Sequence, residues 1–151
     1  MTLLKVENLK THFHTERGLV TAVRGVNFSM KKGEIIGIVG ESGCGKSVMS
    51  QSLIRLQEHT EPVEYEGKVL LDEVDLLQLP LSQLNKIRGN DVSIIFQFLL
   101  ASLNPVYTIG NQIMEVLILH QKLSKKEAKE KAIELLRLTG IPAPDKRVNQ
   151  Y

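Results

Sequence analysis

The stretch Gly40-Glu41-Ser42-Gly43-Cys44-Gly45-Lys46-Ser47 matches the phosphate-binding loop pattern G-x-x-x-x-G-K-[ST]. The apolar residues 35–39 before it predict a buried strand, and residues 48–56 after it predict the first turns of a helix. A strand, a glycine-rich loop and a helix in this order are the context in which the pattern forms a site. With both flanking elements in place, the alternative of a glycine-rich turn with an incidental lysine is much less favoured.

The residue types in this stretch suit the chemistry of a bound triphosphate. Glycines let the backbone curl so that consecutive N–H groups point inward as an anion-binding nest. A helix that begins near Gly45 adds the positive end of its dipole. Lys46 can reach the β- and γ-phosphates as a point charge, and the Ser47 hydroxyl can bind Mg²⁺. The loop therefore predicts a site for a nucleoside triphosphate with magnesium.

The composition is that of an ordinary soluble globular protein. The chain has 151 residues, of which 42% are hydrophobic and 24% charged, and this length suits one domain or one and a fraction. A net charge of +2 is too small to argue for nucleic-acid binding. No apolar run approaches the ~18 residues of a membrane span, and the N-terminus lacks the apolar core of a signal peptide. We therefore expect a cytosolic protein or one peripheral to a membrane.

Cys44 is the only cysteine. One cysteine excludes an internal disulfide and favours a reducing compartment. Because a helix N-terminus lowers a thiol pKa, Cys44 could be redox-sensitive. The simpler interpretation is a small residue that fills a loop position.

The region before the loop predicts an antiparallel subsheet. Leu4 and Val6 alternate with charged residues, which indicates a half-buried strand, and residues 19–30 are also strand-like. Turn signals lie at residues 17–18 and 31–33. A further strand is expected over residues 66–71.

The second half predicts helices and one more strand. Residues 81–88 indicate a short helix that ends at Gly89, and residues 108–120 indicate an amphipathic helix. Ser124 and Glu127 form a capping box that opens another helix, which ends at Gly140. Residues 92–96 indicate a second buried strand.

Gln97 follows this second strand. A polar residue at the end of a buried parallel strand sits where α/β sheets bind ligands, and the alternative is a glutamine that faces solvent. The next residues, 98–100, are apolar and would be a contact patch if exposed.

Aromatic and histidine residues give weaker signals. Phe13 offers a flat face for an adenine ring, although a lone aromatic is more often part of a core or surface. His12 and His14 share one face of a strand, which is a weak metal signal because no third ligand is near. His59 and His120 are isolated.

Four motifs give the chain a resemblance to a known family. They are residues 40–48, residues 86–91, residues 94–97 and residues 102–105. The chain resembles the ATP-binding subunit of ABC transporters and, more narrowly, the oligopeptide/dipeptide importer branch. The resemblance runs from end to end. The first motif is shared by many NTPases, and the other three in this order are more specific to the branch.

The resemblance implies an α/β P-loop NTPase fold with an N-terminal antiparallel subsheet and the start of a helical subdomain. It implies ATP and Mg²⁺ as cofactors, with Phe13 stacked on the adenine. Gln97 would contact Mg²⁺, position the attacking water and sense the γ-phosphate. The residues it assigns to nucleotide binding are Phe13, Gly40, Glu41, Ser42, Gly43, Cys44, Gly45, Lys46, Ser47 and Val48, with Ser47 and Gln97 as metal ligands.

The resemblance also implies partners and location. The partners are transmembrane permease subunits and a second ATP-binding subunit, and the protein would lie peripherally at the cytoplasmic face of the membrane. Residues 1–97 would form the ATP-binding half, and residues 98–151 the connection after Gln97 and a partial helical subdomain.

Two departures from the family pattern stand out. An acidic residue, proline, methionine and threonine would normally follow Gln97, and here Phe98, Leu99, Leu100 and Ala101 follow it. The signature motif, the Walker B aspartate with its glutamate, and the switch histidine are also missing from the sequence. Because phosphoryl transfer to water needs groups that position the nucleophile, we expect a truncated chain that does not hydrolyse ATP alone.

Two rival functions remain open. A non-catalytic nucleotide-binding or interaction module, a fragment without activity, would keep the fold and dock through residues 98–100. It would tolerate Lys46→Ala, whereas an ATP-dependent protein would not. A P-loop kinase is disfavoured because the segment after Gln97 offers neither an acceptor site nor an arginine-rich lid.

Overall fold

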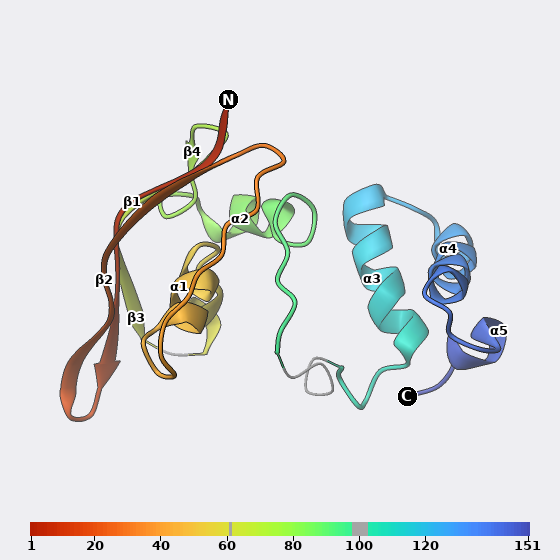
Figure 1. Ribbon diagram of the computed structural model, residues 1–151. Coiled ribbons are helices and arrows are strands. Elements are labelled where there is room, and N and C mark those ends of the chain that lie inside the picture. Colours follow the sequence, from red (N-terminus) through yellow and green to blue (C-terminus); the bar gives the residue numbers. More distant parts are fainter. Residues whose placement is uncertain (61, 98–102) are drawn as a thin grey trace. The chain divides into compact units, whose positions relative to one another are not determined.

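The computed structural model describes residues 1–60, 62–97 and 103–151 and divides into two compact units, Met1–Arg88 and Gly89–Tyr151 (Figure 1). The expected contact patch at residues 98–100 lies outside the described residues. The expected division into an ATP-binding half, residues 1–97, and a partial helical subdomain, residues 98–151, stays a prediction.

The first unit is built on a four-stranded sheet with the order β2-β1-β3-β4, in which every pair is antiparallel. The strands are β1 (Thr2–Thr15), β2 (Gly18–Lys31), β3 (Val63–Leu71) and β4 (Val74–Asp75). The expected antiparallel subsheet is therefore confirmed. Its first two strands are long and pair as a hairpin.

Helix α1 (Lys46–Ser52) and the short 3-10 helix η1 (Leu56–His59) lie between β2 and β3 in the chain, and helix α2 (Leu81–Ile87) follows β4 (Figure 1). The buried apolar side chains come from both the strands and the helices, and each one stabilises the fold by about 1.5–3 kcal/mol. They are Val6, Leu9, Val23, Met49, Ile54, Val69, Leu76 and Leu84.

A β-bulge in β2 brings its backbone toward the helix side. Thr11 pairs with Val23 and His12 pairs with Thr21, so Ala22 is an extra residue in β2. An extra residue bends a strand and leaves the ladder locally disrupted. The bulge matters for the glycine-rich loop, because the Ala22 carbonyl faces Gly45.

The prediction of a buried strand over residues 35–39 is wrong. These residues form no strand, and Ile35 and Val39 are 95% and 93% exposed. A strand is stabilised by hydrogen bonds to a neighbouring strand, and within the described ranges no strand pairs with this segment. The apolar sequence is suited to burial, but burial also requires a partner.

The expected strand over residues 92–96 is also wrong. Val92 makes an isolated bridge, residues 93–96 form no strand, and Ile95 is 87% exposed. The parallel part of the expected mixed sheet is therefore not formed in the part of the chain that the structure describes.

The second unit contains helices α3 (Ile109–Gln121), α4 (Lys125–Leu138) and α5 (Pro144–Arg147). The predicted capping box is confirmed, since Ser124 and Glu127 exchange hydrogen bonds at the start of α4. The unit packs around Leu117, Ala128, Ala132, Leu136 and Val148. Among the described residues, no helix is long and apolar enough to cross a membrane.

Candidate functional site

The glycine-rich loop, residues 40–47, leads directly into α1. Gly45 is the N-cap of this helix, so the expected helix start near Gly45 is confirmed. Gly43 and Gly45 have φ values of 82° and 93°, in the left-handed region that glycine adopts without a steric penalty. The two glycines are therefore required by the backbone path of the loop.

Gly45 is also required by its contact with the sheet. A Cβ atom at this position would lie 2.7 Å from the carbonyl oxygen of Ala22 in the β2 bulge. At Gly43 nothing lies within 4 Å of the corresponding point. Gly45 is thus the place where the loop meets the sheet, and Gly43 faces open space.

Lys46 is folded back over the loop. Its Nζ donates hydrogen bonds to the carbonyl oxygens of Gly40 at 2.8 Å and Glu41 at 2.7 Å. It also lies 3.5 Å from Cys44 Sγ, an exposed free thiol. The ammonium charge is therefore held at the centre of the loop, where an anion that enters the loop would meet it.

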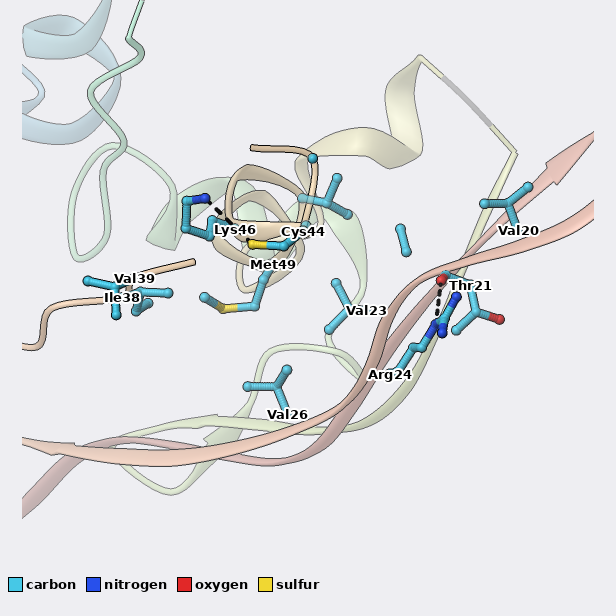
Figure 2. Close-up of a pocket in the computed structure, with 14 residues that line it drawn as sticks. Val20, Thr21, Val23, Arg24, Val26, Ile38, Val39, Cys44, Lys46 and Met49 are labelled. Atoms are coloured by element: carbon cyan, nitrogen blue, oxygen red, sulfur yellow. Dashed lines mark hydrogen bonds between the residues drawn. The ribbon is translucent and has the colours of Figure 1, made fainter. Parts of the chain in front are cut away.

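A cleft of about 670 Å³ lies beside the loop (Figure 2). Its walls are mostly apolar, and its charged side chains are Lys46, beside the backbone of the loop, and Arg24 of β2. The residues drawn in Figure 2 come from β2, from the segment before the loop, from the loop and from α1. The larger apolar side chains among them are Val20, Val23, Val26, Ile38, Val39, Val48 and Met49. This volume is in the range of small-molecule sites, about 300–1,000 Å³.

Phe13 lies on the face of the sheet that carries α1. It is opposite Val20 in β2, and Val20 lines the cleft. Thr11, two residues earlier on the same face of β1, contacts Ser52 of α1. Phe13 itself does not line the cleft but sits next to a residue that does.

The structure places the other expected site residues as follows. Glu41 and Ser42 are exposed in the loop, and Ser47 and Val48 lie in the first turn of α1, with Val48 at the cleft. Gln97 belongs to the second unit, and its role stays a prediction. The sensing role considered for Cys44 also stays a prediction.

Sequence reasoning gave no role to Arg88, which holds the region after α1. Its guanidinium donates to the carbonyl oxygen of Ile54 at 2.9 and 2.7 Å and to that of Arg55 at 2.8 Å. Desolvation by burial lowers the pKa of Arg88 below its usual value. The charge is stabilised by the carbonyl groups that it binds, and α2 is thereby attached to the end of the α1 segment.

The paired histidines contact side chains of the neighbouring strands β2 and β3. His12 Nδ1 lies 2.9 Å from Thr21 Oγ1, and His12 Nε2 lies 3.3 Å from Glu66 Oε1. His14 faces Glu64 at 3.4 Å. Among the described residues, no group of three side chains is placed to hold a metal ion.

The sequence matches the family model described as "ABC transporter" over residues 23–151. It is 47% identical over 149 residues to the oligopeptide transport ATP-binding protein OppD of Bacillus subtilis and 46% identical to the dipeptide transport ATP-binding protein DppD of the same organism. Each alignment covers 99% of this chain, with 42% of the first relative and 44% of the second. The chain thus spans less than half the length of these curated relatives.

Solved structures point to the same family as the sequence comparisons. The dimeric structure of MJ0796, a bacterial ABC transporter cassette, is 26% identical with a TM-score of 0.77, covering 97% of this chain and 60% of that one. A post-hydrolysis state of the same cassette bound to ADP and Pi gives 25% identity and a TM-score of 0.76, with the same coverage. From the family match, the relatives and these cassettes together, we conclude that the chain belongs to the ABC transporter family and has the α/β fold of its ATP-binding cassettes.

Proposed function

We propose that this chain is the nucleotide-binding part of an ATP-binding subunit of a peptide importer. The observation that carries the proposal is the glycine-rich loop, in which Gly43 and Gly45 adopt left-handed conformations and Lys46 lies over the loop. Backbone N–H groups in such a loop suit an anion, and the ammonium group adds a positive charge.

Phosphate binding would exchange the partners of Lys46. The ammonium now donates to two neutral carbonyl oxygens, those of Gly40 and Glu41. A hydrogen bond between two ionised groups is about twice as strong as one between neutral groups. A triphosphate would therefore compete effectively with the loop carbonyls for Lys46.

Magnesium fits the donor chemistry at the start of α1. Ser47 lies in the first turn of this helix and supplies a hydroxyl oxygen, and Mg²⁺ prefers oxygen ligands. When bound, the ion would neutralise phosphate charge. Gln97 is proposed as a second ligand, which would also position water and sense the γ-phosphate.

The base would be held by apolar contacts. The cleft has apolar walls, and Phe13 is the cross-strand neighbour of the cleft residue Val20. An aromatic ring stacks on a flat base with an offset or edge-on geometry. We place adenine toward Phe13 and the phosphates at Lys46.

The proposed partners are supported by the names of the relatives, which are peptide transport ATP-binding proteins, and by the dimeric state of the similar cassette. They are transmembrane permease subunits and a second ATP-binding subunit. The protein would then lie peripherally at the cytoplasmic face of the membrane.

Isothermal titration calorimetry with MgATP tests the proposal. The wild-type chain is expected to bind one nucleotide, and Lys46→Ala to weaken binding by about 10- to 100-fold, since a hydrogen bond to a charged group contributes about 1.5–3 kcal/mol. Lys32→Ala, which removes an exposed lysine outside the loop, is the matched control and should bind like wild type. A folded chain that binds no MgATP would contradict the proposal, and binding that does not depend on Lys46 would favour the interaction module.

A further inference from the structure

A buried pair of hydroxyl groups connects β1 to α1. Thr11 Oγ1 lies 2.8 Å from Ser52 Oγ, and both residues are fully buried at 0% exposure. Thr11 is two residues before Phe13 on one face of β1, and Ser52 is the last residue of α1, which begins at Lys46. The pair therefore joins the strand proposed to hold the base to the helix that follows the phosphate loop.

The direction of this hydrogen bond follows from the number of protons. Ser52 has one hydroxyl proton, and its Oγ lies 2.7 Å from the carbonyl oxygen of Val48, which can only accept. The Ser52 proton must therefore point to Val48. Thr11 therefore donates to Ser52. Without the Thr11 hydroxyl, Ser52 keeps its own acceptor inside α1, and the helix loses its bond to the strand.

Two further polar side chains extend the pair. Ser52 shares its one proton between the Val48 carbonyl oxygen at 2.7 Å and, more weakly, Gln57 Oε1 at 3.5 Å. Gln57 Oε1 also accepts a hydrogen bond from the Tyr65 hydroxyl at 3.3 Å. Burial raises the pKa of Tyr65 to about 12, so its hydroxyl remains protonated and able to donate at neutral pH. We refer to Thr11, Ser52, Gln57 and Tyr65 together as the polar latch.

The polar latch restricts α1 in a way that apolar packing does not. Apolar packing, such as that of the buried Met49 of α1, has no strict direction and tolerates small shifts. A buried hydrogen-bond network has a defined geometry, and a shift leaves costly unpaired groups. The latch therefore fixes the position of α1 along β1 and β3.

We propose that Thr11 is a positioning residue, which holds the Phe13 strand and the Lys46 loop at the spacing that lets one ATP contact both. The inference rests on the proposed ATP site. Two contact points that are already held at the right distance bind one ligand more tightly, because the protein loses less conformational entropy when the ligand binds. A ligand that occupies only the phosphate loop gains nothing from this spacing.

Two probes separate these contributions. MgATP reaches both contact points, whereas magnesium tripolyphosphate reaches only the phosphate loop. Their dissociation constants are measured by calorimetry on wild type, Thr11→Val, Thr11→Ser, Phe13→Ala and the double variant with Thr11→Val and Phe13→Ala. Thr139→Val, which removes a hydroxyl that bonds to the carbonyls of Leu135 and Leu136 in the other unit, is the control for the loss of a threonine hydroxyl.

We expect Thr11→Val to weaken MgATP binding about fivefold, the effect of one lost buried hydrogen bond, and to change tripolyphosphate binding less than about twofold. Thr11→Ser should behave like wild type, because it keeps the hydroxyl. In the Phe13→Ala background, Thr11→Val should have little further effect on MgATP, since one of the two contact points is already lost. Thr139→Val should leave both constants unchanged.

Three results would overturn the inference. Equal weakening of both probes by Thr11→Val would indicate a structural role only. An unchanged MgATP constant in folded Thr11→Val would show that the latch does not set the spacing. Wild-type chain that binds neither probe, or binds both independently of Lys46, would remove the ATP site and the inference with it.

A second variant keeps the inference testable if Thr11→Val fails to fold. If Thr11→Val does not fold, Tyr65→Phe removes the outer donor of the latch with little change in volume. It should lower MgATP affinity relative to tripolyphosphate by a smaller factor in the same direction. An unchanged ratio in Tyr65→Phe would then refute the role of the latch.

Discussion

Replacing Gly45 by alanine should destabilise the first unit much more than replacing Gly43 by alanine. Both glycines have left-handed φ values, 93° and 82°, so alanine at either position incurs the conformational cost of about 1–2 kcal/mol. Only at Gly45 would the new Cβ meet backbone, 2.7 Å from the Ala22 carbonyl oxygen. Overpacking of this kind adds about 1–3 kcal/mol, because β2 or the start of α1 must move.

Thermal unfolding measured by circular dichroism near the β-sheet minimum is a suitable assay, because the described strands all belong to Met1–Arg88. For a unit of this size, 1 kcal/mol corresponds to about 4–8 °C in Tm. Gly45→Ala should therefore unfold at least about 4 °C below Gly43→Ala. Equal Tm values for the two variants would refute the argument that the loop is held against the bulge in β2.

Three further predictions concern other parts of the chain. Hydrogen bonds from the Ser124 hydroxyl and backbone N–H lower the pKa of Glu127 below 4.5. The contribution of this carboxylate to the stability of α4 should therefore be complete above pH 4.5 and be lost as the pH falls through the lowered pKa. In an acid titration followed by helical circular dichroism, Glu127→Gln should abolish this pH dependence. Arg88→Leu should lower the stability of the first unit by about 2–3 kcal/mol in urea unfolding, since it leaves the carbonyls after α1 without their charged donor; a loss below about 0.5 kcal/mol would contradict this. Gln112→Ala should raise amide hydrogen exchange at Asn104, Val106 and Tyr107 about fivefold. The Gln112 side chain accepts from the Asn104 N–H at 2.9 Å and donates to the carbonyl oxygens of Asn104 at 3.0 Å and Tyr107 at 2.9 Å. Unchanged exchange would contradict this.

Local sequence signals predicted the local structure well. The capping box of Ser124 and Glu127, the helix start at Gly45 and the turn at Gly18 each depend on residues within a few positions of one another. The alternation in residues 4–6 likewise identified the start of β1, and the strand-like residues 19–30 identified β2. Such features are decided by side chains and backbone angles that the sequence states directly.

Features that depend on a distant partner were not predictable. The apolar residues 35–39 have the composition of a buried strand, yet pairing requires a neighbouring strand, which a local pattern does not specify. Thr11 and Ser52 are 41 positions apart, and nothing in either segment marks the other as its partner. The bulge at Ala22, which brings a carbonyl against Gly45, has no signal in the sequence either.

The central claim is that residues 40–47 hold the phosphates of ATP. The most direct test is a titration of ¹⁵N-labelled chain with MgATP, followed by two-dimensional NMR of the backbone amides. The account predicts that the largest shifts fall on Gly43, Gly45, Lys46 and Ser47, and that Lys46→Ala removes them. A folded chain whose loop amides stay unchanged at saturating MgATP, or whose shifts cluster outside the loop, would contradict it.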